Sequence, residues 1–199
     1  MAYDFSGSLE RCLNTSGSRP NWYATDCFSV SMRFRSNWVI ADGSMILVLW
    51  HEVADGKWNH YYLYAGNSTG YNLLTWQLKA AGAAYKVVIP EGLTGDTWRT
   101  VIVSANRSAK YLRLYVDGEW YSKASVKFPA TALANMHISF LDWGSEMHGI
   151  NAQVAEVGMW NIDLADGAYT ADVAGLEQGF SPASIRPQNL LAYWPLVRG

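Results

Sequence analysis

Residues 111–121 read YLRLYVDGEWY, a stretch in which Asp117 and Gly118 separate two runs of aliphatic and aromatic residues. An Asp-Gly pair in this setting predicts a β-hairpin with a two-residue turn. The turn also fixes the register of the two strands, so Tyr115 is expected opposite Trp120. The stretch therefore predicts both a local fold and which side chains share a face.

The two faces of this hairpin differ in character. Leu112, Leu114 and Val116 are expected on the side that faces a core, because side chains alternate along a strand. The other side carries Tyr111, Arg113, Tyr115 and Trp120. From the sequence this aromatic side is compatible with core packing, sugar stacking or a protein interface, since tyrosine, tryptophan and arginine suit the last two.

Most of the chain repeats this pattern of short strands and turns. Residues 28–34 alternate apolar and polar residues, which predicts a strand with one buried face. Further strands are expected at 45–51, 60–65, 72–79, 85–89, 98–105, 111–116, 119–128, 136–142, 153–160 and 190–196. One short helix is expected within 170–179, capped by Thr170 and ended by Gly179. The sequence thus predicts an all-β fold, a two-sheet sandwich or a barrel, in one domain over residues 1–199.

The composition limits the classes of binding partner that we expect. The net charge is −2 with no block of lysine and arginine, so binding to nucleic acid is not expected. No apolar run approaches the roughly 20 residues that span a bilayer, and no signal-peptide pattern is visible at the start of the sequence. We therefore expect synthesis and folding in a cytoplasm, without a membrane partner. Cys12 and Cys27 could pair, but two separate buried thiols are favoured in a reducing compartment.

An ordered set of motifs resembles a known superfamily. Phe5-Ser6-Gly7, the strand CFSVSMRF at 27–34, Trp98, LRLYVDGE at 112–119 and VAEVGMWNIDL at 154–164 follow one another as in laminin-G-like domains of the concanavalin A-like superfamily. The resemblance covers nearly the whole chain. It implies a two-sheet antiparallel jelly-roll sandwich with one short C-terminal helix, and large residues such as Trp98 and Trp160 packed in its core.

The last stretch, GFSPASIRPQNLLAYWPLVRG at 179–199, resembles the ends of laminin-G-like proteins of tailed bacteriophages. This implies a non-catalytic structural or interaction protein of a virion, decorating a capsid or tail, made in the host cytoplasm and present in symmetric copies or as a homo-oligomer. Its partners would be other virion proteins, with weak binding of host or mucus glycans. The alternative is a lectin-like carbohydrate-binding module that has no tie to a virion.

Catalytic motifs are absent from the sequence. Glycosidases of this superfamily carry Glu-x-Asp-x-(x)-Glu on one strand, because retaining hydrolysis needs two carboxyl groups roughly 5–5.5 Å apart. This chain has no such motif, so no enzymatic activity is expected, although acids from separate strands could still meet. Glu156 stands alone, and we expect it to bond loop amides or pair with an arginine.

No cofactor is expected. Calcium is the one ion that family members often hold, and the weak candidates for it here are Asp42, Asp142 and Glu146. The loops around them contain few acids, whereas Ca²⁺ takes six to eight oxygen ligands.

The remaining candidate for function is an aromatic interaction surface. Ten tryptophans and twelve tyrosines are many for 199 residues, and only 16% of residues are charged. His60, Tyr62 and Tyr64 share one face of the strand expected at 60–65. The predicted interaction face is made of Tyr111, Arg113, Tyr115, Trp120, Tyr62 and Tyr64.

Overall fold

The structure is a computed structural model of the 199-residue chain. It describes residues 3–4, 13–14, 26–35, 44–54, 57–66, 73–80, 82–90, 96–129, 135–138, 142–143, 146–147 and 153–195. Asp42 and Cys12 lie outside these residues.

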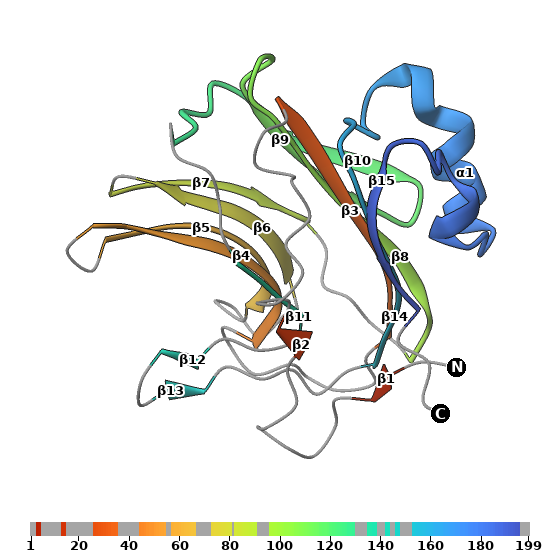
Figure 1. Cartoon of the computed structure of the whole chain (residues 1–199), viewed down its shortest axis with the longest axis horizontal. Helices are drawn as coiled ribbons and strands as arrows, with labels where there is room; N and C mark the ends of the chain where they lie inside the picture. The colour runs from red at the N-terminus through yellow and green to blue at the C-terminus, as the bar shows by residue number, and fades with distance from the viewer. Residues whose placement is uncertain are drawn as a thin grey trace.

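The described strands form two antiparallel sheets that face each other (Figure 1). Sheet A has the order β1 (Tyr3–Asp4), β14 (Gln153–Trp160), β3 (Cys27–Arg35), β8 (Arg99–Asn106), β9 (Tyr111–Val116) and β10 (Glu119–Lys123), with β15 (Leu190–Trp194) also paired to β14. Sheet B has the order β2 (Leu13–Asn14), β11 (Asn135–Ile138), β4 (Ser44–Ala54), β5 (Lys57–Gly66), β6 (Leu73–Ala80) and β7 (Ala83–Val88). A small ribbon pairs β12 (Asp142–Trp143) with β13 (Glu146–Met147). This architecture confirms the prediction of an all-β, two-sheet jelly roll.

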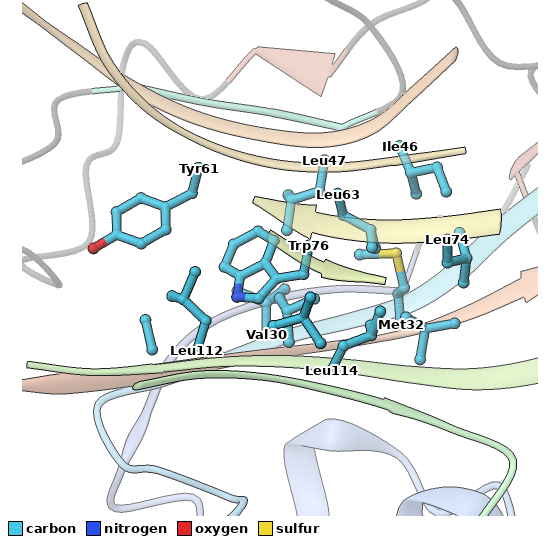
Figure 2. Packing of buried hydrophobic residues seen from close by; sticks show 14 of the residues in the cluster. Val30, Met32, Ile46, Leu47, Tyr61, Leu63, Leu74, Trp76, Leu112 and Leu114 are labelled. Carbon is cyan, nitrogen blue, oxygen red and sulfur yellow. The ribbon is translucent and has the colours of Figure 1, made fainter. Parts of the chain in front are cut away.

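The main core lies between the two sheets (Figure 2). Trp76 is its largest fully buried side chain, and the Trp76 indole donates a hydrogen bond across the core to the Ser104 carbonyl, 3.1 Å away. Tyr61 stacks on Trp76 with ring centroids 5.5 Å apart. A shift in the pairing of β4 with β5 between Met45 and Leu47 accompanies the burial of two consecutive residues, Ile46 and Leu47.

The hairpin at 111–121 confirms the predicted register. Tyr115 pairs with Trp120, and Glu119 pairs with Val116 across the turn. Asp117 and Gly118 have φ values of 49° and 95°, which the two-residue turn requires. The side chains that were expected to point inward, Leu112, Leu114 and Val116, are buried in the main core.

A further layer covers the outer face of sheet A, the face turned away from sheet B (Figure 1). It consists of residues 161–185, here named the cover, and contains η2 (Gly167–Tyr169), α1 (Thr170–Glu177) and η3 (Pro182–Ser184). Its apolar side chains pack with Ile102, Tyr115 and Trp160 of sheet A in a second buried cluster. The jelly roll therefore has apolar packing on both faces of one sheet.

Helix α1 is the single α-helix of the described residues, and its C-terminal end was predicted correctly. Gly179 has a φ of 88°, and the amide of Phe180 donates to the carbonyl of Gly175 at 2.9 Å, which closes the helix with a left-handed residue. The predicted cap at Thr170 is wrong. The Thr170 hydroxyl donates backward to the Gly167 carbonyl, because the 3₁₀ turn η2 runs directly into the helix.

Some predicted strand limits differ from the structure. The strand expected at 119–128 ends at Lys123, and the strand expected at 98–105 begins after Trp98. The sandwich closes where β10 lies close to β7. No helix in the described part of the chain is long and apolar enough to cross a membrane.

Candidate functional site

The cover occupies most of the hairpin face that was predicted as an interaction surface. Tyr115 is only 4% exposed, because it packs against Leu164, Val173 and Leu176 of the cover. Trp120 is half-buried beside it, with ring centroids 5.0 Å apart. This corrects the expectation of an open face at Tyr115, since the protein's own chain fills it.

Tyr111 and Arg113 of the same face hold the cover in place. The Arg113 guanidinium lies 4.2 Å above the centre of the Tyr111 ring and donates a hydrogen bond to the Ala165 carbonyl. The Tyr111 hydroxyl donates to the carboxylate of Asp163. The pKa of Tyr111 is raised to about 12, mainly by burial and secondly by the hydrogen bond to Asp163. Both side chains remain half-buried.

Asp163 is the centre of this polar contact and is itself buried. Besides Tyr111, its carboxylate accepts hydrogen bonds from the Ser104 hydroxyl, from Asn106 Nδ2 at 2.9 Å and from the Ala165 amide at 3.1 Å. Sequence reasoning missed Asp163, because its side-chain partners Ser104, Asn106 and Tyr111 lie more than fifty residues away in the chain.

The second predicted group, on the outer face of β5, is also largely buried. His60 and Tyr62 are each 3% exposed, and a hydrogen bond joins the Tyr62 hydroxyl to His60 Nδ1. Burial, with the charge of Lys79 as a second cause, lowers the pKa of His60 to about 4. Tyr64 is half-buried, and its hydroxyl donates to Gln77 Oε1 at 3.3 Å. The structure thus brings Tyr62 and Tyr64 onto one face, as predicted, but leaves only Tyr64 partly accessible.

A cavity of about 540 Å³ lies on the outer face of sheet A beside the end of α1. We name it the β3–α1 cavity. It is lined by Ser31, Met32 and Arg33 of β3, Trp98 and Thr100 at the start of β8, Gln153, Ala155 and Glu156 of β14, and Leu176, Glu177, Gln178, Gly179, Phe180 and Pro182 of the cover. Its volume falls within the roughly 300–1,000 Å³ of small-molecule sites.

Ser31 is a buried polar group in the lining of this cavity. Its side chain is 2% exposed, and its Oγ has no hydrogen-bond partner among the described residues. An unsatisfied buried hydroxyl costs about 1–3 kcal/mol, so such groups are rare in proteins. The neighbouring Ser29, two residues away on the same face, has partners from the cover, the Ile162 carbonyl and the Leu164 amide, both at 2.9 Å.

Glu156 reaches the cavity through an irregularity in β14. The pairing of β14 with β3 shifts between Ala155 and Gly158, and Glu156 within that shift has a φ of 51°. The extra residue turns Glu156 out of the alternation that buries Val154 and Val157. A left-handed non-glycine residue costs about 1–2 kcal/mol, and such strain often lies at functional sites.

The partner of Glu156 differs from the expected loop amide or arginine. Its carboxylate accepts a hydrogen bond from the Tyr193 hydroxyl at 2.5 Å. Burial, with this hydrogen bond as the next cause, raises the pKa of Tyr193. Glu156 is one of the residues that line the cavity, and its carboxylate can accept further hydrogen bonds besides the one from Tyr193.

The cover side of the cavity adds a second carboxylate and an aromatic ring. Glu177 is exposed at the end of α1, and its carboxylate accepts a hydrogen bond from Tyr115. Burial is the largest cause that raises the pKa of Tyr115, and this hydrogen bond is the second. Phe180 is 56% exposed. Trp98, which was predicted in the core, is instead half-buried in the wall of the cavity.

Arg33 lies between these groups. Its Nη1 donates to Thr100 Oγ1 at 3.4 Å and to the Glu177 carbonyl at 3.3 Å. Both hydrogen bonds are long and use one of its nitrogens, so donors of this guanidinium are available to a ligand.

The structure leaves the calcium candidates open. Asp142 and Glu146 lie on the paired strands β12 and β13, while Asp42 is outside the described residues. Among the described residues, no group of three or more histidine, cysteine, aspartate or glutamate side chains could hold a metal ion. Cys27 forms no disulfide within this part of the chain, and its thiol lies 3.8 Å from the Asn161 carbonyl.

Comparison with known proteins places the fold. No protein family and no curated protein matches the sequence. The CBM40 module of the Ruminococcus gnavus IT-sialidase, solved with α2,3-sialyllactose, matches 85% of this chain and 95% of its own with a TM-score of 0.64 and 16% identity. The SAP-like pentraxin of Limulus polyphemus matches 85% of this chain and 79% of its own, with a TM-score of 0.59 and 13% identity.

Domains LG4-5 of the mouse laminin α1 chain match 79% of this chain and 40% of their own, with a TM-score of 0.55 and 12% identity. At these identities the likeness concerns the fold alone. It confirms the two-sheet antiparallel jelly-roll fold that the sequence motifs implied.

Proposed function

We propose that this protein is a non-catalytic, lectin-like carbohydrate-binding module, and that the β3–α1 cavity is its binding site. The observation that carries the proposal is the composition of that cavity. It combines two aromatic side chains, Trp98 and Phe180, with the hydrogen-bonding groups of Arg33, Gln153 and Glu156. This combination matches the chemistry of a sugar ring.

A sugar presents apolar C–H faces and a rim of hydroxyl groups. The aromatic faces of Trp98 and Phe180 supply apolar surface for the C–H groups. Hydroxyl groups both donate and accept, so they need carboxylate or carbonyl acceptors as well as N–H donors. Glu156 offers acceptors, Arg33 offers donors, and the Gln153 amide offers both.

The fold supports the same proposal. One structure with this jelly roll, the CBM40 module, was solved with a bound sialylated trisaccharide. The cavity described above adds a place on this chain where a glycan would fit.

Glycan-array screening followed by calorimetry tests the proposal. We expect binding to at least one glycan class, and Trp98→Ala and Phe180→Ala should each weaken it by about tenfold or more, as truncation of a central aromatic contact does. The matched control is Val88→Ala, which truncates an exposed apolar residue of β7 in the other sheet. Failure to bind any glycan would refute the proposal.

Turnover must be measured beside binding. Glu156 and Glu177 come from separate elements and line one cavity, which is the arrangement that the sequence motifs left open. A non-catalytic module should release no reducing sugar from the glycans that it binds. Release that is lost in Glu156→Gln would show a hydrolase instead.

The virion role implied by the C-terminal resemblance stays a prediction. None of the similar structures reported above is a phage protein. Mass spectrometry of purified particles checks it, and a glycan-binding module could serve either inside or outside a virion.

A further inference from the structure

We infer that the β3–α1 cavity selects neutral, hydroxyl-rich sugar residues over acidic ones, and that a sugar hydroxyl completes the hydrogen bonding of Ser31. The inference rests on the proposed function and names the ligand class of that site. Two independent observations carry it, the unpartnered Ser31 hydroxyl and the balance of charge in the lining.

Ser31 lies where the sheet offers it no polar neighbour. On its face of sheet A, Ile102 of β8 and Gly158 of β14 are its partners in register, and neither has a polar side chain. Its Oγ is buried, and Ser31 is one of the residues that line the cavity. A buried serine hydroxyl requires a partner that can accept or donate, and a sugar hydroxyl does both.

Ser29 shows what the same residue type does when the protein supplies the partner. Its Oγ donates to the Ile162 carbonyl and accepts from the Leu164 amide, so it ties the cover to the sheet. The cover thus satisfies Ser29 and leaves Ser31, a residue of the cavity lining, without a hydrogen-bond partner among the described residues. This contrast assigns a structural role to Ser29 and a ligand-binding role to Ser31.

The charge of the lining disfavours an acidic ligand. Glu156 and Glu177 contribute two negative charges, against one positive charge from Arg33. The last carbonyl groups of α1 carry partial negative charge and lie beside the same lining residues, where the Leu176 carbonyl accepts from Thr100 Oγ1 and the Glu177 carbonyl accepts from Arg33. A carboxylate or sulfate on the ligand would meet net repulsion, whereas hydroxyl groups would find acceptors.

The ligand test uses matched pairs. An array of neutral glycans is compared with the same glycans carrying a terminal sialic acid or a sulfate, at low and at physiological salt. We expect the neutral member of a pair to bind about tenfold tighter or more, with the difference shrinking as salt screens the charges. Acidic members that bind as well as or better than the neutral ones would overturn the inference, although they would leave the proposed function intact.

A charge variant gives the complementary result. Glu177→Gln keeps the size of the side chain and removes one negative charge, so the penalty against the acidic member should fall by roughly threefold or more. Glu119→Gln, on the exposed strand β10, is the matched control and should leave the ratio unchanged.

Two serine variants separate binding from folding. Ser31→Ala should weaken the affinity for the neutral glycan by roughly five- to twentyfold. It should leave the thermal midpoint of the free protein unchanged or higher, because it removes an unsatisfied polar group. Ser29→Ala should do the opposite, lowering the midpoint with little change in affinity. If Ser31→Ala leaves the affinity unchanged, Ser31 binds water or nothing and the inference fails. If no glycan binds the native protein, the proposed function fails first.

Discussion

Replacing Asp163 with alanine should detach the cover from sheet A. The Asp163 carboxylate accepts four hydrogen bonds, from Ser104, Asn106, Tyr111 and the Ala165 amide. These donors come from β8, β9 and the cover itself, so one side chain joins three parts of the chain.

The expected cost follows from what each donor meets after the substitution. The Ala165 amide is buried and loses its acceptor, whereas Ser104 still has the Phe28 carbonyl at 3.4 Å. Asn106 and Tyr111 are half-buried, so water reaches them. A stranded buried donor costs about 1–3 kcal/mol, and hydrogen bonds to a charged acceptor contribute about 1.5–3 kcal/mol each without adding fully. We therefore expect a loss of about 3–5 kcal/mol in the free energy of unfolding.

Urea and thermal denaturation measure this loss. For a chain of this size the thermal midpoint should fall by roughly 6–20 °C. Amide exchange should accelerate more in α1 than in β9, because the helix loses its anchor while the sheet keeps its ladder. The matched control is Asp166→Ala, which removes an exposed cap on the Ala168 amide and should cost about 1 kcal/mol. A loss below 1 kcal/mol for Asp163→Ala would refute the anchoring role.

Two further predictions concern other parts of the molecule. Because the pKa of His60 is about 4 in the folded protein and about 6.5 when unfolded, the unfolded chain binds the proton first as pH falls. Stability should therefore drop by roughly 3 kcal/mol between pH 6.5 and pH 4, and urea titrations of His60→Gln should show a much smaller drop over that window. Gly158→Ala places a methyl group 2.5 Å from Pro182 Cβ and from the Trp160 ring, so it should cost about 1–3 kcal/mol in thermal denaturation. Gly167→Ala, with nothing within 4 Å, should cost far less.

The hairpin shows what the sequence could predict. A two-residue Asp-Gly turn leaves one register available, so the pairing of Tyr115 with Trp120 and the burial of Leu114 followed from local geometry. The end of α1 was predictable for the same reason, because Gly179 supplies a backbone conformation that other residues rarely adopt.

The candidate site could not be predicted from the sequence, because it depends on structural features that leave no local pattern in the sequence. Alternation along β14 predicts Glu156 on the same face as Val154, and only the irregular pairing with β3 turns it outward. The position of the cover decides that Ser29 has hydrogen-bond partners and that Ser31 has none among the described residues, and the cover follows Ser29 in the sequence by more than 130 residues. No pattern within a single strand could distinguish the two serines.

The aromatic residues illustrate the same limit and sharpen the functional argument. Their number suggested a broad interaction surface, but the fold buries aromatic side chains in two separate clusters, with Trp76 of sheet B in the main core and Trp160 of sheet A under the cover. Among the described residues, the large hydrophobic side chains that stay exposed are Val88 and Phe180. Phe180 lines the β3–α1 cavity, beside a strained Glu156 and an unpartnered Ser31. Binding by this protein should therefore depend on one compact site, and substitutions on the outer face of β5 should leave glycan affinity unchanged.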